Sequence, residues 1–219
     1  MSSSASLQTP DGALPITFAE GHGQGTFVIF PSAFGVTDDL KAQVDEIARH
    51  ARRVATFDPF WRDGVPPLPY SDFPGVMARV RGLDRDKAIA DFVALAGWAR
   101  ARGGDKLVAI GVCFGGPFAL ELGARGMVDG VATWHGSRLE SHLDKLAAAS
   151  CPMALHFGSI DRVVPPAALE QIGEAVRARP EVKVVVHHGA DHGFTHLSGP
   201  TWRADATAAA IADALALGA

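Results

Sequence analysis

The chain has few cysteines, no long apolar run and no concentration of positive charge. Only Cys113 and Cys151 occur among its 219 residues. Two isolated cysteines do not form a disulfide framework, so we expect two free thiols. No apolar run approaches the length of a transmembrane helix, and the first ten residues lack the basic and apolar segments of a signal peptide. These absences predict a cytoplasmic protein that does not associate with a membrane.

Charge and length narrow the class of protein further. The formal net charge is −4, and both signs are interspersed along the chain. Without a basic stripe, neither a nucleic acid nor an anionic membrane surface is an expected partner, which leaves a small-molecule ligand. The length and the 47% of apolar residues suffice for one substantial core. We expect a flexible N-terminus over residues 1–12 and one domain over residues 13–219.

Short apolar segments alternate with segments of helical spacing along most of the chain. The buried strands are expected at 26–30, 53–57, 106–111, 130–134, 153–157 and 182–187. This alternation predicts an α/β fold with a mostly parallel, doubly wound sheet flanked by helices. We also expect a short edge strand at 13–18. The connection 58–84 shows little periodicity, and we interpret it as a wall or lid over a site.

The stretch Gly111-Val-Cys-Phe-Gly115 is the pattern around which the rest is organised. It matches the G-x-S-x-G nucleophile elbow, with cysteine in place of serine, between an expected strand and an expected helix. Small residues two positions before and after Cys113 allow the strand and helix to approach closely. A thiol at a helix N-terminus is stabilised as a thiolate. Cys113 is therefore a candidate nucleophile, although a buried structural cysteine would also fit this pentapeptide.

Two later loops supply the other members of a triad in the order that α/β-hydrolases use. Asp161 follows the expected strand 153–157, and His192 follows the expected strand 182–187. Nucleophile, acid and histidine then all lie at the carboxyl ends of strands, where such sheets gather their ligands. This order favours a catalytic Cys113. Asp191 is a rival for the acid, but its position next to His192 in sequence favours Asp161.

The segments 111–116, 158–165 and 189–194 resemble those of the dienelactone hydrolase family. Members of this family are α/β-hydrolases with a cysteine nucleophile. Phe34-Gly35-Val36 is similar to the oxyanion loop of that family. The resemblance runs from about residue 26 to the C-terminal helix. It implies hydrolysis of a carboxylic ester or lactone by a Cys-His-Asp triad through an acyl-cysteine, with no cofactor and no metal.

The same resemblance leads to expectations for the rest of the site. Backbone N–H groups of Phe114 and Ala33 would form the oxyanion hole. Side chains expected to line the substrate site are Ser32, Phe34, Trp61, Arg81, His135, Phe194 and His196.

Two of these positions depart from the family. Ser32 stands where the family has a glutamate, and His196 stands where it has a carboxylate-binding arginine. A histidine lacks the charge and the fork of arginine, so we expect a substrate less anionic than dienelactone. Arg79 and Arg81 lie in the segment that would carry a second such arginine.

Two other functions remain open at this level. The chain could be a binding or redox-sensor protein in which Cys113 is an oxidisable thiol. It could also be an acyl transferase, because a thioester can be intercepted by nucleophiles other than water. The oligomeric state is expected to be a monomer or a homodimer.

Overall fold

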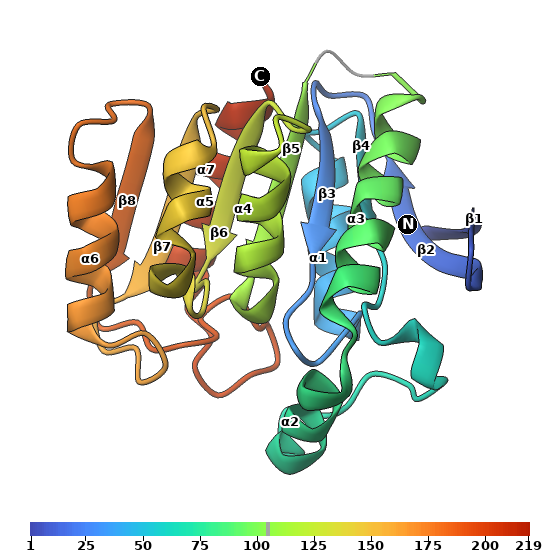
Figure 1. Cartoon of the computed structure of the whole chain (residues 1–219), viewed down its shortest axis with the longest axis horizontal. Helices are drawn as coiled ribbons and strands as arrows, with labels where there is room; N and C mark the ends of the chain where they lie inside the picture. The colour runs from blue at the N-terminus through green and yellow to red at the C-terminus, as the bar shows by residue number, and fades with distance from the viewer. Residues whose placement is uncertain (104–105) are drawn as a thin grey trace.

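The computed structural model describes residues 1–103 and 106–219 and has three layers, an eight-stranded sheet between two layers of helices (Figure 1). The strands are β1 (Ser3–Thr9), β2 (Gly12–Glu20), β3 (Thr26–Phe30), β4 (Arg53–Thr56), β5 (Leu107–Val112), β6 (Gly130–Trp134), β7 (Met153–Gly158) and β8 (Val182–His187). The α-helices are α1 (Asp38–Ala48), α2 (Phe73–Gly82), α3 (Arg85–Arg100), α4 (Gly116–Ala124), α5 (Leu143–Ala148), α6 (Pro166–Val176) and α7 (Ala204–Gly218). Short 3-10 helices are η1 (Trp61–Asp63), η2 (Cys113–Gly115) and η3 (Leu139–His142).

The strand order is β1-β2-β4-β3-β5-β6-β7-β8, and the six strands from β4 to β8 in this order are parallel. Every residue of β3, β5 and β6 is buried, as expected for apolar strands covered on both faces. In Figure 1, α3, α4, α5 and α6 lie in front of the sheet, and α1 and α7 lie behind it. Two apolar cores correspond to these two faces. The predicted single-domain α/β fold is confirmed.

The N-terminus differs from the flexible segment that we expected over residues 1–12. Residues of β1 pair with β2 in an antiparallel hairpin, from Ser3 with Phe18 to Thr9 with Gly12. Ala5 and Leu7 pack against the core while Ser4, Ser6 and Gln8 are exposed, so the segment has the period of two of a half-buried strand. The serine content obscured this alternation. β2 consequently lies between β1 and β4 and is not an edge strand.

The connection 58–84 also contains more regular structure than we expected. Asp72 caps α2 by accepting a hydrogen bond from the Gly75 N–H (3.0 Å), and Pro74 occupies the first turn. Val76 is the one buried residue of this helix, so the helix has no apolar stripe that periodicity could detect. α2 extends past the carboxyl edge of the sheet (Figure 1).

Strand register brings the loops that follow the parallel strands together at one edge. Val112 pairs with Trp134, which places the turn after β5 beside the turn after β6. Gly158 pairs with His187 at the ends of β7 and β8. In the part of the chain that the structure describes, no helix combines the length and the apolarity needed to cross a bilayer.

Candidate active site

The turn after β5 holds Cys113 in a strained backbone conformation. Its φ is 51°, in the left-handed region that residues with a Cβ rarely adopt. A Cβ at Gly111 would lie 2.6 Å from the Gly115 carbonyl oxygen, and one at Gly115 would lie 2.1 Å from the Phe30 carbonyl oxygen. Only glycine fits at either position. The elbow geometry predicted from the pentapeptide is confirmed.

Cys113, His192 and Asp161 form one continuous line of contacts. The Cys113 Sγ lies 3.1 Å from the His192 Nε2, and the His192 Nδ1 lies 2.8 Å from the Asp161 Oδ2. The other carboxylate oxygen of Asp161 accepts hydrogen bonds from the N–H groups of Val163 (2.7 Å) and Val164 (2.9 Å). These bonds hold the carboxylate in place, so the imidazole orientation is fixed by the turn after β7.

Asp191 does not take the acid position. Its Oδ1 accepts hydrogen bonds from the N–H groups of His192 (2.7 Å) and Arg162 (3.2 Å), and its Oδ2 lies 3.3 Å from the Arg162 Nε. The carboxylate therefore ties two loops together and does not contact the imidazole of His192.

The contact between Cys113 and His192 favours a thiolate beside an imidazolium. Burial alone raises the pKa of the Cys113 thiol, but the charge and hydrogen bond of His192 outweigh it and leave the pKa below its usual value. Burial alone lowers the pKa of His192, whereas the Cys113 thiolate and the Asp161 carboxylate raise it to about 10. Each charge thus stabilises the other, and the contact with His192 favours the thiolate form of Cys113.

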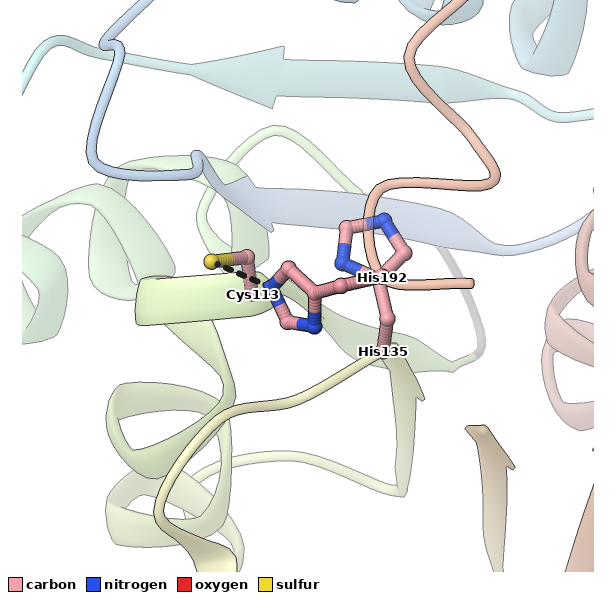
Figure 2. A group of neighbouring side chains, drawn as sticks. All are labelled: Cys113, His135 and His192. Atoms are coloured by element: carbon pink, nitrogen blue, oxygen red, sulfur yellow. Dashed lines mark hydrogen bonds between the residues drawn. The ribbon is translucent and has the colours of Figure 1, made fainter. Parts of the chain in front are cut away.

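His135 comes from the turn after β6, and its ring lies next to the His192 imidazole (Figure 2). Its ring centroid is 4.8 Å from that of His192 in an edge-on arrangement, and its Nε2 lies 2.8 Å from the Thr195 Oγ1. The side chain has no exposed surface. His135 therefore does not line an open cavity in this structure, and its contact with a substrate stays a prediction.

Phe34 and His196 lie together in an aromatic cluster with Tyr70. The His196 ring stacks on Tyr70 at 4.8 Å, and the Phe34 ring meets both edge-on. Burial, and then the charge of His192, lower the pKa of His196 to about 4. His196 is therefore neutral near pH 7. Ser32 is buried and lines a small cavity of about 10 Å³ together with Tyr70 and His196.

Three predicted substrate residues are not brought to the triad. Phe194 is completely buried in the core behind the sheet. The indole of Trp61 donates to the Asp91 carboxylate (2.9 Å) and fastens its segment to α3. Arg81 is exposed on α2. Phe194 and Trp61 therefore have structural roles here. The apolar core surrounds the Phe194 ring, and the buried Asp91 carboxylate accepts the hydrogen bond of the Trp61 indole.

Other residues near the elbow were missed by sequence reasoning. The Ser137 N–H donates to the Cys113 carbonyl oxygen (3.0 Å), and its hydroxyl also helps to lower the pKa of the thiol. The Phe60 ring stacks on Phe114 at 5.9 Å, and the Arg79 guanidinium lies 4.6 Å from the Phe60 ring centroid. The sequence carries no signal for these contacts beyond their positions in loops at the carboxyl edge.

A cavity of about 400 Å³ adjoins the elbow. Its lining is Val80, Leu83, Arg85, Phe114, Pro117, Ser137, Arg138 and His142. In the described residues, neither Arg85 nor Arg138 lies within ion-pair distance of a carboxylate. The cavity therefore combines an apolar wall with two guanidinium groups that can receive an anion.

Comparison with known proteins gives consistent matches over most of the chain. A model described as the dienelactone hydrolase family matches residues 19–217. Carboxymethylenebutenolidase of Pseudomonas sp. (strain P51) is 30% identical over 168 residues, which cover 72% of this chain and 68% of that protein. A Klebsiella pneumoniae crystal structure assigned to the dienelactone hydrolases superimposes with a TM-score of 0.86 at 21% identity, over 99% of this chain and 97% of the other. P91, a dienelactone hydrolase-like promiscuous phosphotriesterase from metagenomic libraries, gives 0.76 at 21% identity over the same shares.

Proposed function

The chain belongs to the dienelactone hydrolase family and is a hydrolase of carboxylic ester or lactone bonds, and we propose that it works through an acyl intermediate on Cys113. The observation that carries this proposal is the contact of 3.1 Å between the Cys113 Sγ and an imidazole that Asp161 orients. A nucleophile, a base and a group that orients the base are the arrangement that covalent catalysis needs.

In the acylation step, the Cys113 thiolate attacks the ester carbonyl carbon, and the carbonyl π electrons move to oxygen. The N–H groups of Phe114 and Ala33 are proposed to stabilise that oxyanion. Phe114 directly follows the nucleophile, and Ala33 follows β3 at the same edge of the sheet. When the carbonyl re-forms, the bond to the alkoxide breaks and the His192 Nε2 donates its proton to the leaving oxygen.

In the deacylation step, the neutral His192 takes a proton from water. Acylation has removed the thiolate charge that raised the pKa of His192, so the imidazole can act as a base. The water oxygen attacks the thioester carbonyl carbon, the C–S bond breaks to release the acid product, and the thiolate of Cys113 and the imidazolium of His192 are restored. The Asp161 carboxylate stabilises the imidazolium in both steps.

The substrate is proposed to be an ester or lactone less anionic than dienelactone, whose bulk occupies the cavity beside Phe114. The neutral His196 supports this proposal, because it cannot form the charged contact expected from the family. If the substrate carries a negative group, Arg85 and Arg138 are the residues in this cavity that would bind it.

The proposal is tested with an activated short-chain aryl ester, comparing the wild type with Cys113→Ala and taking intact masses after rapid quenching. Cys151→Ala is the matched control, because its thiol lies outside the triad. We expect steady release of the aryl alcohol and an acyl adduct in the wild type and the control, and neither in Cys113→Ala. If the thiol is not acylated and turnover equals that of Cys113→Ala, the hydrolase proposal is wrong and the redox-sensor function becomes the better one.

Addition of an alcohol or a thiol to the same reaction separates hydrolysis from acyl transfer. A hydrolase releases mainly the free acid, because water attacks the acyl-cysteine. If the acyl group is transferred to the added nucleophile in preference to water, the chain is an acyl transferase.

A further inference from the structure

His135 has one ring nitrogen that the hydrolytic mechanism does not use. In the described residues, its Nδ1 is buried and has no hydrogen-bond partner. A buried polar atom without a partner is costly, and such atoms are rare in folded proteins. If the Nε2–H donates to the Thr195 Oγ1, the Nδ1 presents a lone pair.

His135 also belongs to a compact group of metal-ligating side chains. One ligand atom from each of Cys113, His135 and His192 lies within 4.8 Å of the other two. Figure 2 shows the three side chains converging from the turn after β5, the turn after β6 and the loop after β8. Cys113 and His192 are partly exposed, so a small ion can enter from their side.

We propose that Cys113, His135 and His192 form a zinc site that inhibits the enzyme reversibly. A thiolate and two imidazoles are ligands that favour Zn²⁺ over Mg²⁺ or Ca²⁺, which prefer oxygen. Three protein ligands leave the fourth tetrahedral position for water.

Zinc binding requires the three ligand atoms to move to nearly equal separations. Bonds of about 2.0–2.3 Å to a tetrahedral ion place the ligand atoms roughly 3.5 Å apart. The Sγ and Nε2 atoms of the pair are already 3.1 Å apart, and the largest separation in the group is within 4.8 Å. Asp161 holds the opposite nitrogen of His192, which is the carboxylate–histidine–metal arrangement found around protein zinc ions.

Zinc binding would replace a proton. The thiolate of Cys113 donates an electron pair to the ion, and the imidazolium of His192 releases its Nε2 proton to solvent before this nitrogen binds. No atom is oxidised or reduced, and one proton is released for each ion bound. The bound ion blocks the sulfur that would attack an ester, so inhibition follows from occupancy of the nucleophile.

The test measures metal binding without an ester substrate, so its outcome is independent of the proposed hydrolysis. Co²⁺ is titrated as a spectroscopic probe, and Zn²⁺ affinity is measured by competition with a chromophoric chelator. We expect one ion per chain and a thiolate-to-cobalt charge-transfer band that Zn²⁺ removes. Loss of an outer-sphere partner costs roughly 10- to 100-fold in affinity, so His135→Gln and Cys113→Ser should each weaken Zn²⁺ binding by about 100-fold or more.

His188→Gln and Cys151→Ser are the matched controls, because they make the same changes at a histidine and a cysteine outside the group. Both should bind Zn²⁺ like the wild type. Circular dichroism checks that each variant is folded, and Cys113→Ser tests the site even if His135→Gln unfolds. The proposal is overturned if the wild type shows no thiolate-to-cobalt band, or if folded His135→Gln binds Zn²⁺ with unchanged affinity.

Discussion

Two histidines on neighbouring parts of the sheet are held in opposite charge states. His192 lies 2.8 Å from the Asp161 carboxylate, and its pKa is raised to about 10. His156 lies on β7 with its Nε2 3.2 Å from the Asp213 Oδ2, yet burial lowers its pKa to about 4. Each imidazole therefore has a carboxylate neighbour, but only one of them is protonated near pH 7.

The second neighbour of each ring explains the difference. His192 faces the Cys113 thiolate, which adds a second negative charge. His156 instead lies 2.9 Å from the Nε2 of His187, and its carboxylate partner is shared with Lys183 (2.7 Å). One shared carboxylate does not offset the cost of burying a charged ring, whereas a carboxylate and a thiolate together do.

Replacing Asp161, the proposed acid of the triad, should have the largest effect. Asp161→Asn removes a negative charge from His192 and allows the wrong imidazole tautomer, so we expect kcat to fall by up to about 10⁴-fold, as in serine-protease triads. Asp191→Asn, which changes a carboxylate that binds backbone N–H groups, should cost less than about 10-fold. Steady-state ester hydrolysis measures both, and equal losses in the two variants would mean that Asp161 has no special role.

The buried histidine should make the fold sensitive to acid. Because the folded-state pKa of His156 is depressed, its unfolded form binds a proton below about pH 6.5 while the folded form stays neutral until about pH 4. Stability is therefore lost as the pH falls through this window, by up to about 3 kcal/mol. His135 and His196 have lowered pKa values and add to the same loss.

Urea unfolding of the wild type and of His156→Gln from about pH 7 to about pH 4 measures this contribution. The variant should lose less stability over the window, because it has one fewer buried neutral histidine. The exposed His188→Gln should follow the wild type. Parallel pH curves for all three proteins would show that His156 is not held neutral by the fold.

The thiols of Cys113 and Cys151 should differ in charge state in the same way as the two histidines, with a smaller effect. Contact with His192 lowers the pKa of Cys113, whereas burial raises the pKa of Cys151. At neutral pH, Cys113 should react with iodoacetamide at least about 10-fold faster than Cys151, because the thiolate is the reactive form. Peptide mass mapping at short times gives the two rates. The pH midpoint for Cys113 should rise in His192→Gln.

Much of this site could be predicted because it lies in short motifs at strand ends. The elbow glycines, Asp161 and His192 each occupy a position that follows an apolar strand, and the parallel sheet brings those ends together. The glycine requirement at positions 111 and 115 follows from close backbone contacts of this turn. Local sequence and topology agree here, so the fold class was predicted correctly, and the three side chains expected to form a triad lie in contact.

The segment that packs against the elbow could not be predicted in the same way. Trp61 and Phe60 are adjacent aromatic residues, and only the structure shows that Phe60 reaches the elbow while Trp61 binds Asp91. α2 has a single buried residue and hence no periodic signal. The roles of His135 and His196 depend on burial by distant segments, which residue identity alone does not encode.

The charge state of His192 is the most direct test of this account. Nitrogen NMR of ¹⁵N-histidine-labelled protein, assigned with His192→Gln, reports the protonation of both ring nitrogens as the pH is changed. We predict an imidazolium at neutral pH in the wild type, with a pKa of about 10 that falls in Cys113→Ser. A neutral His192 ring in the wild type at neutral pH would contradict the preformed thiolate–imidazolium pair.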